Sequence, residues 1–387
     1  MRTITKYIFV ILIWFLSIVR RLYRGRRQVE LEDSHCLVVS LSGIGNAIMC
    51  LPLLQALKEQ HGAAAVDVLT TGAAQETIFR NIGFTDEIYK YPLNLRQKCS
   101  LLLFLRKKKY DALLLAFPTP EISYAVLPTL INPRTALTHD YSMFHPFFKY
   151  LGHIADRVLP IRTDLHDIEQ NLHLIESCNV NKFEFKAYPT VHLSKASLEN
   201  ADEFYRKNKL GSNSILCFMH PGSKRGADYK RWPVANFLTL GQLLVQENNI
   251  KIVAIIGPDE IELRDQFAKS GFILLESTDF ATTLAILSRA SFLVSNDSGL
   301  MHTAALLEIP TVTVWGGTDV SRNGARGNLA INVMNKSMPC RPCVKFVANV
   351  RCPDAAFLCI RSIDAEQVYQ SIKSNGLLKP IQMPKTN

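Results

Sequence analysis

The feature that most constrains the fold is an alternation of short apolar runs with helix-like stretches, and it appears twice along the chain. Such alternation is typical of parallel α/β units, in which each run is a buried strand. The sequence therefore predicts an α/β protein with two Rossmann-like sheets in series. The predicted strands are 36–41, 66–70, 111–117 and 134–138 in the first series, and 215–220, 251–256, 291–296, 311–315 and 329–333 in the second.

The length of the chain also favours two domains. The chain has 387 residues, which is more than one hydrophobic core usually serves and is enough for two domains of about 150 residues each. We expect the first at residues 34–193 and the second at 213–375, with Gly211-Ser212-Asn213 as the best linker candidate.

The net charge of +10 is concentrated at the N-terminus. Residues 1–27 hold seven basic residues and no acidic one, beside an uncharged apolar run at 7–19. This combination indicates an anionic membrane surface as partner. No aromatic-basic motif follows it, so we expect no nucleic-acid binding.

The apolar run is thirteen residues long, about 20 Å as a helix, which is short for a hydrocarbon core of about 30 Å. An arginine-rich stretch follows where a signal-peptide cleavage site would be expected. We therefore expect residues 1–28 to be a retained membrane anchor, either crossing or interfacial; the alternative is a buried amphipathic helix. Five basic residues follow the run and two precede it, which predicts a cytoplasmic body if the helix crosses.

In open α/β sheets, ligands bind beyond the carboxyl ends of the strands, so we expect the functional residues in the turns that follow the strands. In SGIGN (42–46), Gly43 and Gly45 would let the backbone approach an anion at a helix N-terminus. A simple tight turn is the alternative, and the third glycine of a dinucleotide fingerprint is missing.

The second turn, HPGSKRGADYKRWP (220–233), combines small residues such as Ser223 with cations. Lys224 and Lys230, with Arg225 and Arg231, could neutralise a diphosphate. The alternative is a solvated basic loop.

The third turn, SNDSGLMHTAA, begins a helix whose free N–H groups at Ser298 and Gly299 form an anion site. Asp297 would repel phosphate, so we expect it to cap the helix or to hold a ribose or Lys230. His302 lies one turn inside and either faces the phosphates or is a core histidine.

A fourth turn, WGGTD (315–319), has paired glycines that indicate close backbone approach. Together with SGIGNAIMCLPLLQALK, HPGSKRGADYKRWP, IIGPDEIEL and NDSGLMHTAALLEIPTVTVWGGTD, it resembles glycosyltransferase family 9, the lipopolysaccharide heptosyltransferases. The resemblance covers roughly residues 37–372.

The resemblance implies a GT-B fold, in which an N-terminal acceptor domain and a C-terminal nucleotide-sugar donor domain face a cleft. It implies inverting transfer of a sugar, a heptose from ADP-heptose, to a lipopolysaccharide-core or other lipid-linked envelope glycan. No cofactor or catalytic metal is implied, and the chain has no Asp-x-Asp motif. With the anchor, this predicts an enzyme at the cytoplasmic face of the inner membrane.

By the same resemblance, Lys230 looks like the family lysine that contacts the donor diphosphate. Asp297, Ser298, Gly299 and His302 look like the donor-binding turn and helix start. Glu260 resembles a carboxylate available to the nucleoside or to the other domain.

One position departs from the family pattern. Typical members have an aspartate, proposed as the general base, where this chain has Asn46. Inversion by single displacement needs a base for the acceptor hydroxyl, and an amide cannot serve. Because ligands bind beyond the carboxyl ends of the strands, the remaining candidates for the general base are Glu121, His139 and Asp140.

Four cysteines cluster near the C-terminus: Cys340, Cys343, Cys352 and Cys359. A Cys-x-x-Cys pair with two further thiols suits structural zinc, although the spacing is not that of a standard finger. Disulfides and reduced thiols are the alternatives, and a cytoplasmic body argues against permanent disulfides.

Two other functions stay open. A dinucleotide-dependent oxidoreductase would use SGIGN, but its glycine pattern is incomplete. A glycan- or nucleotide-sugar-binding protein with weak or no catalysis is compatible with Asn46.

Overall fold

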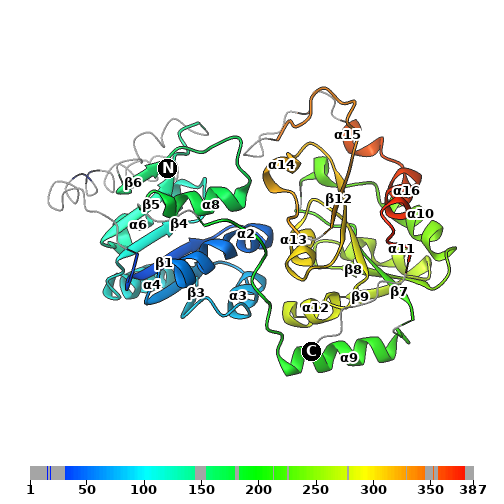
Figure 1. Cartoon of the computed structure of the whole chain (residues 1–387), viewed down its shortest axis with the longest axis horizontal. Helices are drawn as coiled ribbons and strands as arrows, with labels where there is room; N and C mark the ends of the chain where they lie inside the picture. Colours follow the sequence, from blue (N-terminus) through cyan, green and yellow to red (C-terminus); the bar gives the residue numbers. More distant parts are fainter. Residues whose placement is uncertain are drawn as a thin grey trace. The chain divides into compact units, whose positions relative to one another are not determined.

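The chain forms two compact units, Met1–Pro189 and Thr190–Asn387, in a computed structural model (Figure 1). The structure describes residues 15, 18, 31–143, 154–178, 183–211, 213–224, 226–276, 279–327, 329–344, 352 and 356–379. The predicted anchor at 1–28 lies outside these residues except for Phe15 and Ile18. Within the described ranges, no helix has the length and apolar character needed to cross a bilayer.

Unit 1 contains a six-stranded parallel sheet in the order β3-β2-β1-β4-β5-β6. The first strand lies at the centre, so the chain winds outward in both directions, as in a Rossmann-like fold. The strands are β1 (His35–Ser40), β2 (Ala65–Thr70), β3 (Ile88–Lys90), β4 (Ala112–Leu115), β5 (Thr135–His139) and β6 (Arg157–Leu159).

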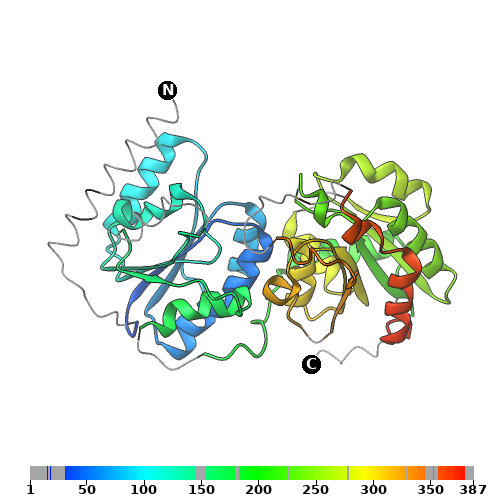
Figure 2. The same cartoon turned by 90° about the horizontal axis from the view of Figure 1, so that it is seen from above.

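Helices cover both faces of this sheet (Figure 2). On one face α2 packs against α8, and on the other α4 packs against α6. On the side of the sheet that α4 covers, Leu105 and Ile131 join Leu37 and Leu113 in one buried cluster. The helices are α2 (Ile44–Gln55), continued by η1 (Ala56–Gln60), then α3 (Ala73–Arg80), α4 (Leu95–Lys107), α5 (Ile122–Ala125), α6 (Leu127–Ile131) and α8 (Asp167–Glu176).

Unit 2 repeats this architecture with the parallel order β12-β11-β10-β7-β8-β9. Its strands are β7 (Ile215–His220), β8 (Ile250–Ile256), β9 (Ile273–Glu276), β10 (Phe292–Asn296), β11 (Thr311–Trp315) and β12 (Ala330–Met334). Its helices are α9 (Lys195–Lys207), η2 (Asp228–Lys230), α10 (Val234–Val245), η3 (Ile261–Leu263), α11 (Arg264–Lys269), α12 (Phe280–Leu287), α13 (Gly299–Leu306), α14 (Val320–Asn323), α15 (Leu358–Arg361) and α16 (Ala365–Ser374). Apolar clusters fill both faces of the sheet.

All nine predicted strands are confirmed to within a few residues. The sequence did not reveal β3, β6 and β9, because each is short and lies at or next to a sheet edge. These strands have only three or four residues, too short a run to stand out, whereas the five-residue edge strand β12 was predicted.

Unit 1 ends at Pro189, close to the expected end of the first domain at 193, and unit 2 begins at Thr190, before the linker candidate 211–213. The helix between these points, α9, packs on α12. Tyr205 Oη donates to Ile286 O at 2.8 Å, and Asn200 Nδ2 donates to Thr282 Oγ1 at 3.1 Å. These contacts make α9 part of unit 2.

Candidate functional site

The turn after β1 leaves the N-terminus of α2 open. Gly43 is the N-cap, its φ of −71° is ordinary, and a Cβ there would meet no atom within 4 Å. Neither strain nor crowding therefore requires this glycine. Gly45 and Asn46 lie in the first turn of α2, and Asn46 is half-buried with no side-chain hydrogen bond to the described part of the chain.

Hydrogen bonds join this turn to the loops that follow β4 and β5. Ser42 Oγ donates to Pro118 O at 2.7 Å, just beyond β4. The Thr119 N–H donates to Tyr141 Oη at 2.7 Å, just beyond β5. Because β1, β4 and β5 are parallel neighbours, these bonds hold three strand-end loops along one edge of the sheet.

The three candidate bases differ in their access to that edge. Glu121 is exposed at the start of α5, and Asp140 is half-buried with Oδ1 accepting the Ser142 N–H at 2.8 Å. His139 is buried, with Nε2 3.0 Å from Gln170 O. Burial lowers the pKa of His139 to about 3, against the opposing effect of that hydrogen bond. His139 is thus a neutral core residue, and the two carboxylates are better suited to accept a proton.

In unit 2, one buried amide organises the loop after β7. Asn296, at the end of β10, donates from Nδ2 to Pro221 O at 2.7 Å. Its Oδ1 accepts the Trp232 N–H at 3.0 Å. Trp232 Nε1 in turn donates to Ile363 O at 2.7 Å. Both ends of the loop between Pro221 and Trp232 are therefore fixed.

Lys230 and Asp297 form an ion pair inside this loop. Lys230 Nζ lies 2.7 Å from Asp297 Oδ2, and their side chains are 18% and 5% exposed. Ser223 Oγ donates to Asp297 O at 3.1 Å. The predicted pairing of Asp297 with Lys230 is confirmed, and the ammonium group is held at the carboxyl end of the sheet.

The first turn of α13 has no side-chain cap. Its N-cap is Ser298, which makes no capping hydrogen bond, and the alternative in which Asp297 caps the helix was wrong. Asp297 pairs with Lys230 instead, and Ser298 Oγ is buried without a hydrogen-bond partner among the described residues. The N–H groups from Gly299 onward thus remain available to an anion. His302 is buried one turn further along.

Glu260 and Arg231 lie beside this loop. Arg231 Nη2 donates to Ser223 O at 2.7 Å and lies 4.0 Å from Glu260 Oε1. Burial raises the pKa of Glu260, and the negative charge of the nearby Asp259 raises it further. A Cβ on Gly222 would lie 2.1 Å from Glu260 Oε1, so only glycine lets the carboxyl group sit there.

The paired glycines after β11 confirm the predicted close approach, but the approaching atoms belong to the protein. A Cβ on Gly316 would lie 1.8 Å from Tyr229 O, and one on Gly317 would lie 2.5 Å from Cys343 Sγ. The Gly317 N–H also donates to Tyr229 O at 3.3 Å. The position of Lys230, which follows Tyr229, therefore depends on the turn at Gly316.

The structure thus brings together Ser223, Lys230, Glu260 and the turn at Asp297. Lys224 is exposed and makes no side-chain hydrogen bond or ion pair within the described residues, whereas Arg225 lies outside them. Sequence reasoning missed Asn296 and Trp232. An asparagine that ends a buried strand was the available signal, because such an amide needs several hydrogen bonds.

The cysteine cluster lies against this same region. Cys343 Sγ donates weakly to Gly317 O at 3.7 Å. Burial, then the neighbouring Cys340 and Cys352, raises the pKa of Cys343, and burial raises that of Cys359. No three metal-ligating side chains within the described ranges are arranged to hold a metal ion. All four cysteines are free thiols in the structure.

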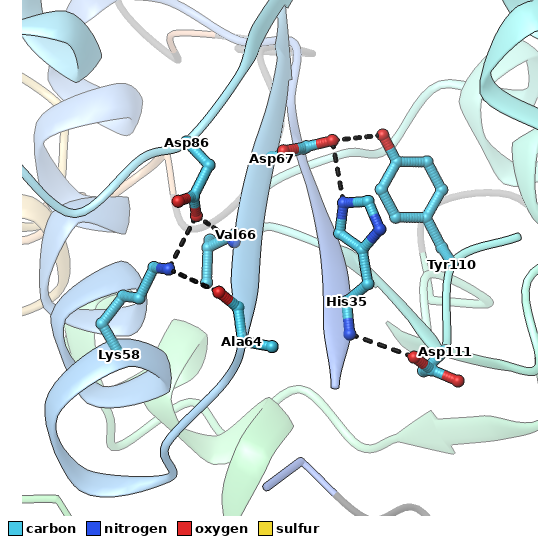
Figure 3. Close-up of polar contacts among 8 residues, drawn as sticks. All are labelled: His35, Lys58, Ala64, Val66, Asp67, Asp86, Tyr110 and Asp111. Atoms are coloured by element: carbon cyan, nitrogen blue, oxygen red, sulfur yellow. Dashed lines mark hydrogen bonds and ion pairs between the residues drawn. The ribbon is translucent and has the colours of Figure 1, made fainter. Parts of the chain in front are cut away.

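A second polar cluster lies at the amino ends of the strands in unit 1, away from the strand-end loops (Figure 3). Asp67 is fully buried; its Oδ2 accepts Tyr110 Oη at 2.6 Å and lies 3.0 Å from His35 Nε2. Burial and the Asp67 hydrogen bond raise the pKa of Tyr110. Nearby, Lys58 Nζ lies 2.7 Å from Asp86 Oδ2. These groups satisfy one another, which indicates a structural role.

The site in unit 2 combines a fixed ammonium group with an uncapped helix N-terminus, which is suited to a phosphate-bearing ligand. The family model described as glycosyltransferase family 9 (heptosyltransferase) matches residues 99–352. Lipopolysaccharide heptosyltransferase 1 of Campylobacter coli is 22% identical over 369 residues, covering 87% of this chain and 97% of that protein.

Solved structures show the same fold. The glycosyl transferase family 9 protein of Veillonella parvula has a TM-score of 0.74 at 19% identity, covering 91% of this chain and 99% of that one. The iron-containing heptosyltransferase TibC, in complex with ADP-D-beta-D-heptose, has a TM-score of 0.57 at 13% identity, covering 91% and 79%. The chain therefore has a GT-B-like fold with two parallel sheets, belongs to glycosyltransferase family 9, and is a glycosyltransferase.

Proposed function

We propose that this enzyme transfers heptose from ADP-heptose, with inversion, to a lipopolysaccharide-core or other envelope glycan. The observation that carries the proposal is the Lys230–Asp297 pair beside the uncapped start of α13. The ADP-heptose complex of TibC and the name of the Campylobacter relative support the donor and the acceptor class.

The donor diphosphate becomes a better leaving group when its developing charge is stabilised. Lys230 supplies an ammonium group, whose charge the Asp297 carboxylate partly offsets, and the first N–H groups of α13 supply the positive end of the helix dipole. Asp297 fixes the ammonium group at 2.7 Å, so little reorganisation is needed as charge develops. We propose that these groups serve without a catalytic metal.

The acceptor hydroxyl must lose a proton as its oxygen attacks the anomeric carbon and the bond to the diphosphate oxygen breaks. Asn46 cannot accept that proton, and His139 is closed off from the surface. We propose that Asp140 or Glu121 accepts it, with ADP as the leaving group. Asn46 would then hydrogen-bond the acceptor or the sugar.

We also propose that the enzyme works at the cytoplasmic face of the inner membrane. The support is the basic, apolar sequence of residues 1–27. A structural metal at the four C-terminal cysteines stays a prediction as well, which metal analysis of the purified chain tests.

Donor titration of the full-length chain tests the function. ADP-heptose, other nucleoside diphosphate sugars and ADP are compared by calorimetry, and turnover is followed by product mass. Lys230→Ala should weaken donor binding about 10- to 100-fold, the usual effect of a lost hydrogen bond to a charged group. Lys269→Ala, an exposed lysine of the same unit, is the matched control. If no nucleotide sugar binds, or if Lys230→Ala binds it as tightly as the native chain, the proposed function fails.

A further inference from the structure

Helix α4 and the loop before it expose several large apolar side chains. Leu93, Leu95, Leu103 and Phe104 are 98%, 75%, 61% and 48% exposed. They make up four of the ten large apolar side chains that stand out as exposed in the described part of the chain. Isolated exposed residues are normal on a protein surface, but a local group marks an interaction surface.

The other side of α4 packs against the core of unit 1. Leu105 is fully buried, and Leu101 and Leu102 pack against the same apolar cluster. The helix also contacts α6. By helix geometry Leu103 and Lys107 lie on the side of α4 opposite Leu105, with Leu95 and Phe104 at its two margins. Phe104 is partly covered by Tyr89 and Lys108.

The same segment is strongly basic. Residues 88–110 contain seven basic residues and no acidic one: Lys90, Arg96, Lys98, Arg106, Lys107, Lys108 and Lys109. Lys98 lies 5.0 Å from the centre of the Tyr91 ring, and Lys108 lies 5.8 Å from that of Phe104. Cations and apolar groups thus share one surface, which we call the α4 face: Leu93, Leu95, Arg96, Leu103, Phe104 and Lys107.

We propose that the α4 face binds the headgroup region of an anionic lipid bilayer. Leucine and phenylalanine side chains gain free energy by entering the boundary between headgroups and acyl chains. Lysine and arginine at the same depth are attracted to anionic phosphates. A run of cations without apolar neighbours would indicate only a solvated surface. Here exposed leucines lie among the cations, and this combination indicates lipid.

Charge complementarity argues against two other occupants. A second copy of this chain would place the same seven cations against one another across a symmetric contact. The N-terminal segment 1–27 also carries seven basic residues and no acidic one, so it too would be repelled. An anionic membrane supplies the opposite charge to both segments.

This contact is separate from the N-terminal anchor and does not depend on sugar transfer. A single tether leaves a protein free to rotate on the membrane, whereas a second contact fixes which face lies on the lipid. Lipid binding by the α4 face can therefore be measured whether or not the proposed donor is correct.

Cys99 provides a native probe, since it is exposed on α4. An environment-sensitive NBD fluorophore is attached to it in the full-length chain, with labelled Cys99→Ser giving the background from other thiols. Vesicles of phosphatidylglycerol and phosphatidylethanolamine should shift the emission to the blue and raise its intensity, and phosphatidylcholine vesicles should do so far less. High salt should weaken the response, because headgroup attraction is screened.

The combined substitution Leu93→Ser and Leu103→Ser should raise the lipid concentration for half-maximal response by roughly tenfold. Both side chains are mostly exposed, so thermal melting should match the native chain. Ile261→Ser, a 59% exposed position in unit 2, is the matched control and should not change the response.

Three results would overturn the proposal. One is an unchanged NBD spectrum while the chain co-sediments with vesicles, which would mean that the α4 face points away from lipid. Another is a fluorophore already shielded before vesicles are added, which would mean that residues 1–28 or a second copy covers the face. The third is an equal response to phosphatidylcholine vesicles.

Discussion

Replacing Gly316 by alanine should displace the backbone that carries Lys230. The new Cβ would lie 1.8 Å from Tyr229 O and 3.0 Å from Tyr229 C. A flexible side chain could rotate away, but a carbonyl oxygen moves only with its peptide. To reach a separation of 3.0 Å the oxygen must shift by about 1.2 Å, and Lys230 is the next residue.

The expected effects follow from that shift. Overpacking in a well-packed region costs about 1–3 kcal/mol of folding free energy. The Lys230–Asp297 ion pair at 2.7 Å tolerates little displacement. A misplacement of about 1 Å in a positioning group can lower a rate by about 100-fold, so we expect a loss of that order in donor turnover.

The assay compares Gly316→Ala with Gly211→Ala, where a Cβ would meet no atom within 4 Å. Thermal melting, calorimetric binding of ADP-heptose and the transfer rate are measured for both. We expect Gly211→Ala to behave as the native chain. If Gly316→Ala loses stability but keeps native donor affinity and rate, the packing of this turn does not position Lys230 and the reasoning is refuted.

Three further predictions concern unit 1 and the buried histidines. Burial lowers the pKa of His139 to about 3 and that of His220 to about 4, so below pH 6.5 the unfolded chain binds protons that the folded chain does not. The free energy of unfolding should therefore fall as the pH drops from 7.5 to 5, by about 2 kcal/mol for each histidine. In urea melts the His139→Gln variant should lose about 2 kcal/mol less over this range than the native chain. Tyr110→Phe removes the 2.6 Å hydrogen bond to buried Asp67 and should cost about 1–3 kcal/mol; an unchanged urea midpoint would contradict this. Asp140→Asn should slow transfer by about 100-fold or more with donor affinity retained if Asp140 is the base, and a native rate would exclude it.

The central strands of both sheets could be predicted because their burial on two faces requires continuous apolar runs. The runs at 215–220 and 311–315 became β7 and β11 without a change of boundary. The edge strands β3, β6 and β9 and the start of unit 2 could not be predicted in this way. Whether α9 joins one unit or the other depends on tertiary contacts such as Tyr205 Oη to Ile286 O.

Strand-end position could predict which residues of unit 2 lie close together, whereas how they pair depends on packing. Strand-end position indicated the group of cations in the loop after β7 and the turn at Asp297 after β10, and the family resemblance singled out Lys230. The sequence left open whether Asp297 would cap α13 or pair with Lys230, because that choice depends on how two loops meet. Nor could it show that His139 is closed off while Asp140, just past the end of β5, is half-buried, because burial of His139 depends on contacts such as that of Nε2 with Gln170 O.

The crowding at Gly316 bears on how sequences of this kind can diverge. What fills the space beside it is a main-chain oxygen, which every amino acid possesses, so no replacement of Tyr229 can make room for a larger residue. Compensation would require a different course of the chain itself. Related sequences that keep this packing should therefore retain glycine at position 316, whereas the residue at position 229 is free to change.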